Sequence, residues 1–399
     1  MDFPTTDISQ MEPMLPEERT HALEDVAFDL VSSASSLEGQ INPVVMRSVG
    51  NLVRSMNCYY SNFIEGHNTH PRDIDRALQN NLSQQPERRN LQLEAVAHIE
   101  VQKAIDEGLD DPSVPLTGTY AVWLHREFCN RLPEDMLWVE DANSHRKIRV
   151  VPGQLRDGEV EVGKHVPPAA AALPRFLARF DEAYDPKSIS KLRQIVATAA
   201  AHHRFAWIHP FYDGNGRVVR LMAHAMLKRL GIGNSLWSVA RGLARNVAKY
   251  KSLLAEADQP RRSDLDGRGA LSQAALVTFC QFFLETCLDQ VSYMRSILQP
   301  VELLNRIEIY TEEEVRAKRL LKGSFALLRE AVLAGEFDRG KAAILTGYKE
   351  RMAREVLAQL TAKQILISDT PKSPVRLGFP LDIVERWFPA LYPASERAR

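Results

Sequence analysis

One stretch restricts the fold of this chain more than any other, because it has to end one helix and start another within a few residues. It is residues 209–220, with the sequence HPFYDGNGRVVR. Apolar residues recur at helical spacing before it, and Pro210 lacks a backbone N–H and clashes with the preceding turn, so the first helix ends at His209. Helical spacing resumes at Val218, Leu221, Met222 and Ala225. The sequence therefore predicts two buried helices joined by a short loop, the second beginning at about Gly216.

The loop between these helices has the composition of an anion-binding site. Gly214, Asn215 and Gly216 tolerate left-handed or otherwise unusual backbone angles, which allows successive N–H groups to point into one concavity at a helix N-terminus. Arg217 and Arg220 share a face of the first helical turn, and their planar guanidinium groups match phosphate oxygens. We interpret the loop as a polyphosphate site.

Three further side chains of the loop have distinct expected roles. Asp213 precedes the concavity, where a carboxylate can hold Mg²⁺ against phosphate oxygens. His209 can accept a proton near neutral pH. Phe211 is predicted to point the opposite way, into the core, and to anchor the loop.

The stretch resembles the Fic motif, HPFx[DE]GNGRxxR, at every constrained position. The resemblance implies a mostly α-helical bundle with a small β-hairpin flap, and an enzyme that transfers AMP from ATP to a hydroxyl side chain of a target protein. His209 would then deprotonate a target Ser, Thr or Tyr, Asp213 would hold the Mg²⁺ that bridges the α- and β-phosphates, and Arg220 would clamp the γ-phosphate. The residues implied to bind ATP are Glu65, His209, Gly214, Asn215, Gly216, Arg217, Val218, Val219, Arg220 and Asn246.

A second motif lies at the end of a predicted helix upstream. Asn42 is suited to cap this helix and Pro43 to start it, and Gly66 is a plausible C-terminal stop. Glu65 lies in the last turn, where a carboxylate faces the negative end of the helix dipole. Its position therefore predicts a cationic partner.

Ser61, Glu65 and Gly66 match [ST]xxxE[GN], the inhibitory motif of many Fic proteins. The resemblance implies the class with an N-terminal inhibitory helix, in which Glu65 pairs with Arg220 and displaces the γ-phosphate of ATP. In some Fic relatives this glutamate activates water and removes AMP from modified targets. The sequence does not decide between inhibition alone and inhibition with AMP removal.

Residues 146–162 are predicted to form a short hairpin. Apolar and polar residues alternate there around Pro152-Gly153 and Asp157-Gly158. By its position this hairpin corresponds to the Fic flap, whose free edge could hold a target peptide as an added strand. The alternative is a solvent-exposed hairpin without a ligand.

Composition indicates the expected environment. Lys+Arg 50 against Asp+Glu 51 leaves no global field that favours nucleic acid or membrane. The cysteines are scattered without a CxxC pair, which fits free thiols in a reducing cytoplasm: Cys58, Cys129, Cys280 and Cys287. We expect a cytoplasmic protein without membrane contact. Residues 1–20 are predicted to form a poorly ordered arm. His125 and the pair His202-His203 are interpreted as packing or capping residues, because no carboxylate or thiolate stands at zinc spacing.

Three regions are predicted: a helical N-terminal region with the inhibitory helix (1–110), a Fic catalytic core (111–305) and a C-terminal domain (306–399). In the last region the predicted helices are 325–334, 341–345 and 348–360, and the predicted strands are 365–368 and 375–377. This order suggests a winged helix-turn-helix domain, a fold often used on DNA. Acidic residues alternate with its basic ones, so DNA binding through residues 320–378 is less favoured than target docking or formation of a homodimer.

Two functions from different classes follow. The first is a protein adenylyltransferase that uses ATP and Mg²⁺, inhibited by Glu65. The second is a transcriptional regulator in which the Fic part senses a nucleotide and the C-terminal domain binds DNA. The sequence favours the enzyme and leaves the target protein, the acceptor residue and the oligomeric state open.

Overall fold

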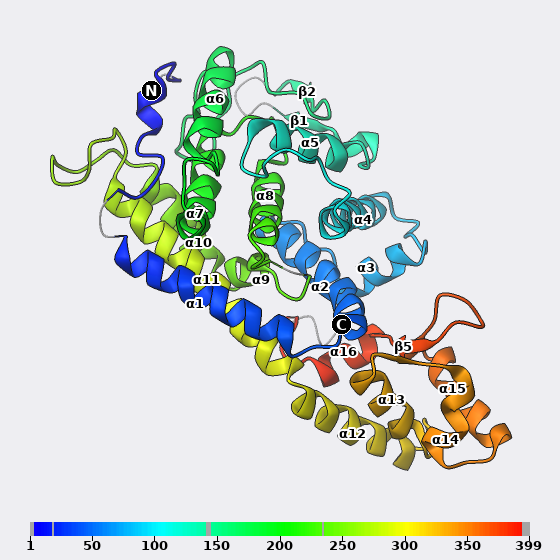
Figure 1. Cartoon of the computed structure of the whole chain (residues 1–399). Coiled ribbons are helices and arrows are strands. Elements are labelled where there is room, and N and C mark those ends of the chain that lie inside the picture. Colours follow the sequence, from blue (N-terminus) through cyan, green and yellow to red (C-terminus); the bar gives the residue numbers. More distant parts are fainter. Residues whose placement is uncertain (1–3, 18–19, 141–144, 234, 393–399) are drawn as a thin grey trace. The chain divides into compact units, whose positions relative to one another are not determined.

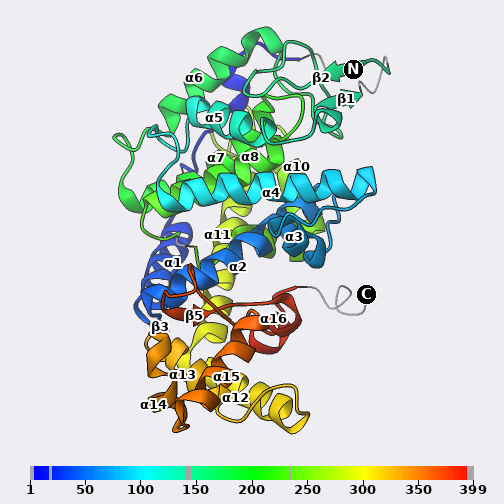
Figure 2. The same ribbon diagram turned by 90° about the vertical axis from the view of Figure 1, so that its right-hand side faces the viewer.

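The computed structural model describes residues 4–17, 20–140, 145–233 and 235–392. Within these ranges the chain is mostly α-helical, with a two-stranded and a three-stranded antiparallel sheet (Figures 1 and 2). The chain divides into two compact units. Unit 1 contains the described residues of 1–34, 57–234 and 238–290, and unit 2 those of 35–56, 235–237 and 291–399. The mostly α-helical fold class predicted from the sequence is confirmed.

Two buried helices form the centre of unit 1. They are α7 (Lys191–Ile208) and α8 (Asn215–Arg229), which stand side by side in Figure 1. The other α-helices that lie wholly in unit 1 are α3 (Pro71–Leu78), α4 (Pro86–Glu107), α5 (Gly118–Cys129), α6 (Leu173–Ala183), α9 (Val239–Arg245) and α10 (Val247–Ala257). Three longer helices contribute residues to both units: α1 (His21–Gly39), α2 (Pro43–Ile64) and α11 (Gln273–Leu298).

The sequence of α7 explains its burial and its end. Alanines at 197, 199, 200 and 201 are at most 1% exposed, and such small side chains let neighbouring helices approach closely. The helix starts at Ser190, whose hydroxyl accepts the Arg193 N–H (3.4 Å), and stops where Pro210 follows His209. This close packing gives the end of α7 a fixed position in unit 1.

Both predicted ends of α2 are present. The Asn42 side chain accepts the Val44 N–H (2.9 Å), and the helix begins at Pro43. After Ile64 the chain turns through Gly66, whose φ of +87° lies in the left-handed region that favours glycine. The turn holds Glu65 at the helix end, as the sequence predicts.

The expectation of a poorly ordered arm at residues 1–20 is wrong for the described residues 4–17. They include a short 3-10 helix (Ile8–Met11), and Met11 and Met14 are buried. The buried Arg204 donates to the Pro13 carbonyl through Nε (3.0 Å) and Nη2 (2.9 Å), and the Tyr184 hydroxyl donates to the Met14 carbonyl (2.6 Å). Proline-rich composition suggested disorder, but partners far along the chain satisfy this backbone.

The predicted hairpin at 146–162 is also wrong in its pairing. Strand β2 (Lys147–Arg149) pairs with β1 (Trp138–Glu140), upstream of it, with Val139 opposite Ile148. Residues 150–161 form a loop, and the bridge between Val162 and His165 is isolated. Tertiary contacts of this loop, described below, override its short alternation of apolar and polar residues.

The C-terminal part of unit 2 contains the helices and strands predicted for it. They are α13 (Ser324–Leu333), α14 (Ala342–Thr346), α15 (Glu350–Ala362), β4 (Leu366–Ile367) and β5 (Val375–Leu377). Three further elements were not predicted: α12 (Pro300–Arg316), β3 (Glu336–Phe337) and α16 (Leu381–Trp387). Strand β3, which the sequence analysis missed, completes an antiparallel sheet of order β3-β5-β4. The assignment to the winged-helix class stays a prediction. Among the described residues, no helix is both long and apolar enough to cross a lipid bilayer.

Candidate functional site

The turn between α7 and α8 is held by its own backbone and by Asn215. His209 ends α7 in the left-handed region (φ +48°), with its N–H on the Phe205 carbonyl (3.1 Å). The Asn215 side chain accepts the Phe211 N–H (3.0 Å) and donates to the Phe211 carbonyl (2.8 Å). Asn215 therefore fastens the turn, and its side chain is not free to contact a ligand.

The predicted concavity differs from expectation in its backbone. Of Gly214, Asn215 and Gly216, Gly214 has a positive φ (+82°), while Asn215 and Gly216 lie in the regular first turn of α8. Gly216 is small for a different reason, because a Cβ there would overlap the Glu65 carboxylate and lie 3.1 Å from an Arg220 nitrogen. The loop therefore approaches the Glu65 turn closely.

His209 presents a half-buried, neutral imidazole. Burial lowers its pKa to about 4, and the positive charge of Arg156 contributes to the shift. A neutral imidazole is the form that can accept a proton, so at neutral pH His209 has the protonation state of a general base.

Arg156 ties the loop at 150–168 to the end of α7. Its buried guanidinium donates to the carbonyls of His209 (2.9 Å), Gly158 (2.9 Å) and Pro168 (2.5 Å), and its own N–H donates to the Pro210 carbonyl (2.9 Å). A single side chain thus satisfies three carbonyls, two in the loop and one at the end of α7, and fixes the backbone that carries His209.

His125, which lies on α5, supports the turn from its other side. Its ring stacks on Phe211 at 3.9 Å with an angle of 2°, and its Nδ1 accepts the Gly153 N–H (2.9 Å). Burial lowers its pKa to about 4. Phe211 is fully buried, as expected from the sequence, and the stacked pair anchors the loop in the core.

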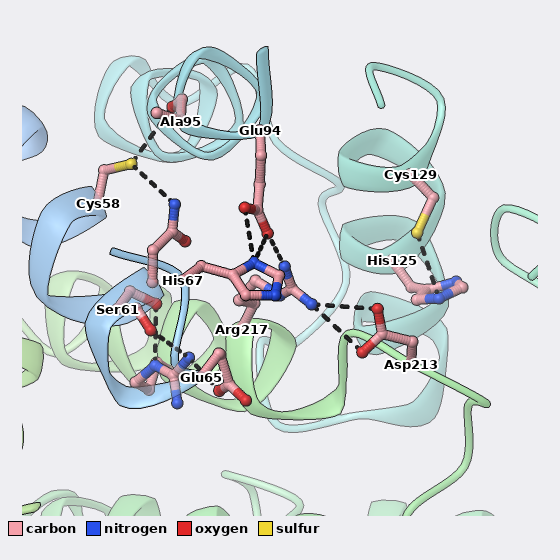
Figure 3. A network of polar contacts seen from close by, with 12 residues as sticks. Cys58, Ser61, Glu65, His67, Glu94, Ala95, His125, Cys129, Asp213 and Arg217 are labelled. Carbon is pink, nitrogen blue, oxygen red and sulfur yellow. Dashed lines mark hydrogen bonds and ion pairs between the residues drawn. The ribbon is translucent and has the colours of Figure 1, made fainter. Parts of the chain in front are cut away.

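Arg220 is bound by the end of α2, whose Ser61 and Glu65 are labelled in Figure 3. Its Nε donates to the Ser61 hydroxyl (2.9 Å), and its Nη2 donates to the Ser61 carbonyl (3.1 Å) and to Glu65 Oε1 (2.6 Å). Burial raises the pKa of Glu65, but Arg220 and then Arg217 outweigh it, and the pKa lies below its usual value. The pairing of Glu65 with Arg220 is therefore present in the structure, and its inhibitory effect stays a prediction.

Arg217 lies in a second charged cluster, which Figure 3 shows together with Asp213, His67 and Glu94. One guanidinium nitrogen pairs with the buried Glu94 of α4, and Nη2 lies 3.2 Å from each Asp213 oxygen. The same Glu94 contacts His67 Nδ1 at 2.8 and 3.0 Å. Burial lowers the pKa of Arg217 to about 10, so the guanidinium stays charged at neutral pH.

The remaining residues implied to bind ATP lie around this centre. Val218 and Val219 have buried side chains, 1% and 2% exposed. Asn246 joins α9 to α10 and accepts the Tyr250 N–H (2.9 Å) through its carbonyl. Tyr250 in turn contacts His202 (2.7 Å). Burial raises the pKa of its phenol to about 12, and a hydrogen bond with Arg220 acts in the opposite direction. Contacts of these residues with a nucleotide stay a prediction.

Asp213 is the residue best suited to a magnesium ion. Its side chain is 45% exposed, although burial raises the pKa of its carboxyl group. In the described part of the chain, no three His, Cys, Asp or Glu side chains gather as a metal site. Mg²⁺ is commonly held by one or two carboxylates together with substrate phosphates and water, so this single accessible carboxylate fits an ion that arrives with a nucleotide.

Several residues of the site were missed from the sequence: His67, Glu94, Arg156 and Tyr250. Glu94 carried no local signal, because it is 0% exposed while the apolar Leu91 and Leu93 beside it are half-buried. A carboxylate at such a position requires a buried cation.

The Fic/DOC family matches residues 115–227, a range that includes the whole turn and α5. The chain contains a Fic domain. The Fic domain that the motif predicted is confirmed. Ser61, Glu65 and Glu94 lie outside the matched range, so their part in the site rests on the contacts described above.

Curated relatives and solved structures agree with this assignment. Proteins called "Protein adenylyltransferase Fic" from Drosophila erecta and Drosophila willistoni are each 39% identical over 79 residues, which are 20% of this chain and 16% of the relative. The match thus spans about a sixth of the length of these relatives.

A Fic family protein from Desulfovibrio desulfuricans G20 has the same fold, with a TM-score of 0.52 and 18% identity over 92% of this chain and 98% of that one. A Fic domain containing signaling protein from Bacteroides thetaiotaomicron covers 68% of this chain and 95% of its own, with a TM-score of 0.50 and 18% identity. These two similarities establish the fold of the Fic domain.

The low pKa of His209 predicts the pH dependence of its chemistry. The imidazole should lose its ability to accept a proton when the pH falls towards about 4, well below the usual value of 6.5. If the chain transfers AMP, we expect kcat/KM, which reports the free protein, to stay flat from pH 8 to 6 and to fall with an acid limb near 4.

Acid stability is the control for this profile. A lowered pKa means that the unfolded chain binds the proton first, so His209 contributes stability above pH 6.5 that is lost as the pH falls through about 4. Circular dichroism at each pH would separate unfolding from titration. An acid limb between pH 6 and 7 in folded protein would contradict the prediction.

Removal of the Arg156 side chain should destabilise the Fic domain. Arg156→Ala leaves the carbonyls of His209, Gly158 and Pro168 without their donor, and we expect a loss of about 3 kcal/mol or more in the free energy of unfolding. Urea unfolding measures the loss. The matched control is Arg149→Ala, which removes an exposed ion pair with Glu134 and should cost less than about 1 kcal/mol. Equal effects would show that the Arg156 contacts do not support the turn.

Proposed function

We propose that this protein is an adenylyltransferase that transfers AMP from ATP to a Ser, Thr or Tyr hydroxyl of a target protein or of itself. The observation that carries the proposal is the arrangement of the turn between α7 and α8. A neutral imidazole, an accessible carboxylate and two buried guanidinium groups converge there within twelve residues of a Fic domain. Similarity to proteins named adenylyltransferase over 79 residues supports the same activity.

The proposed chemistry is a nucleotidyl transfer. His209 takes the proton of the acceptor hydroxyl, the freed oxygen forms a bond to the α-phosphorus, and the bond from that phosphorus to the bridging oxygen breaks and releases diphosphate. Arg217 and Arg220 hold the phosphates and offset the negative charge that develops. Mg²⁺, held by Asp213 and the phosphates, would supply further charge stabilisation. Positioning and electrostatics therefore account for the rate enhancement.

Glu65 acts as an inhibitor in this proposal. Its carboxylate accepts a hydrogen bond from Nη2 of Arg220 at 2.6 Å, so an incoming γ-phosphate has to compete for the same donor. The Ser61 hydroxyl and carbonyl hold the rest of that guanidinium. ATP is then bound with its α-phosphate misaligned until Glu65 moves. Removal of AMP from modified targets by a Glu65-activated water is a second activity that we propose for the same site.

The expected partners follow from this chemistry. ATP is the donor, and a flexible hydroxyl-bearing segment of a protein is the acceptor. The four free and buried cysteines of the described chain fit the reducing cytoplasm expected from the sequence, and that location stays a prediction. A homodimer or a docked target through residues 320–378 is preferred over DNA, because Arg354 of α15 already pairs with Glu350 at 2.8 Å.

One experiment separates the enzyme from a nucleotide-sensing transcriptional regulator. The purified protein is incubated with ATP labelled at the α-phosphate and Mg²⁺, with and without a cell lysate, and analysed by denaturing gel and mass spectrometry. Covalent label on a hydroxyl side chain supports the transferase. The absence of label, together with salt-sensitive binding to a defined duplex, would support the regulator instead.

A further inference from the structure

A buried carboxylate outside the predicted site determines how Arg217 is held. Glu94 is 0% exposed, and it contacts the guanidinium of Arg217 on one side and the imidazole of His67 on the other (Figure 3). A carboxylate without water needs such partners, and breaking one contact is costly. The position of Glu94 is therefore fixed by α4 and by both neighbours.

The two acids that bind Arg217 differ in their exposure. The side chain of Asp213 is 45% exposed, and both of its oxygens share one nitrogen of Arg217 at the long distance of 3.2 Å. Glu94 is inaccessible to solvent. When phosphate and Mg²⁺ compete for this cluster, Asp213 is the acid that can release Arg217, while Glu94 keeps it.

Two further observations show that Arg217 has N–H donors available for an anion. The ring of Phe128 lies 5.1 Å from its guanidinium carbon and restricts its plane. Its Nε is buried and has no hydrogen-bond partner among the described residues. Release by Asp213 would free Nη2 as well, so the guanidinium has donors left over for phosphate oxygens.

His67 connects this cluster to the turn that carries Glu65. It follows Glu65 by two residues, and its N–H donates to the Asn62 carbonyl (2.9 Å), which closes the turn after α2. The Glu65 carboxylate and the His67 ring are therefore carried by the same short turn.

We propose that Glu94 is a positioning residue that holds Arg217 for the nucleotide phosphates, and that His67 couples its orientation to the Glu65 turn. The inference rests on the proposed ATP site and extends it to α4. Arg217 and Arg220 are then controlled from one turn, Arg220 directly by Glu65 and Arg217 through His67 and Glu94.

The test measures binding rather than transfer, in a Glu65→Gly parent. Isothermal titration gives the Kd of Mg²⁺–ATP and of adenosine for the parent, for Glu94→Gln and for Glu100→Gln, an exposed control on the same helix. We expect Glu94→Gln to raise the Kd of ATP about tenfold to a hundredfold and to leave adenosine unchanged, because the lost contact acts through the phosphates. Equal weakening of both ligands, or of neither, would overturn the proposal.

His67→Ala provides an independent route if Glu94→Gln does not fold, because His67 is 36% exposed in its side chain. It should raise the Kd of ATP severalfold with the same selectivity, and the double variant should be no worse than Glu94→Gln alone, because both changes act through one carboxylate. Additive effects, or no effect of His67→Ala, would refute the coupling. A parent that binds no ATP would refute the nucleotide site itself, which is a separate result.

Discussion

Glu65→Gly is expected to raise the rate of AMP transfer about tenfold to a hundredfold. The substitution frees Arg220 from a charge-assisted hydrogen bond of 2.6 Å, and a contact of this kind contributes about 1.5–3 kcal/mol. Each 1.4 kcal/mol corresponds to a factor of ten, so the γ-phosphate should gain that much in competition for Arg220. The rate of label incorporation from ATP, measured at saturating Mg²⁺, checks the prediction.

Glu107→Gly is a matched control for this substitution. Glu107 is an exposed acid at the end of α4, and Gly108 follows it in the left-handed conformation, as Gly66 follows Glu65. The control should leave transfer unchanged. If Glu65→Gly gave a rate equal to or lower than that of the unmodified protein while remaining folded, Glu65 would not be an inhibitor.

His209→Ala is expected to reduce transfer by about a hundredfold to ten-thousandfold in the Glu65→Gly background. A positioned general base contributes a factor of this size, and burial keeps the His209 imidazole neutral and able to accept the proton at neutral pH. Binding of ATP should change little, since the phosphates contact the arginines. Label incorporation and isothermal titration with ATP measure the two effects separately.

The backbone at this position requires a second variant. His209 has a φ of +48°, which asparagine tolerates better than alanine does, so His209→Asn removes the base with little strain. Both variants should lose transfer alike, and His21→Ala, at an exposed histidine of α1, should retain it. Transfer that survives in His209→Asn would exclude His209 as the base and would point to another proton acceptor.

Local sequence was sufficient to predict the elements that carry the site. Pro210 ends α7, Asn42 and Pro43 start α2, and Gly66 turns the chain after it, because each of these effects depends on a few neighbouring residues. The order of side chains from His209 to Arg220 identified the Fic domain before the fold was known. The position of Glu65 at the end of a helix was enough to predict that its carboxylate needs a cationic partner.

The sequence could not show where local patterns give way to distant partners. The alternation at 146–162 suggested a hairpin, but Arg156 in that segment binds the His209 carbonyl, 53 residues away. The N-terminal residues appeared disordered, yet Arg204 holds the Pro13 carbonyl across 191 residues. In both cases a buried guanidinium satisfies backbone groups that no local rule assigns.

The sequence by itself determined which chemical groups stand at the turn and which helices flank it. The tertiary structure alone decided how those groups are held: Glu94 reaches Arg217 over 123 positions, and Ser61 reaches Arg220 over 159. The physical reason is that a buried charge must find its partner in space, and the helix packing that brings the two together has no periodic signature in the chain.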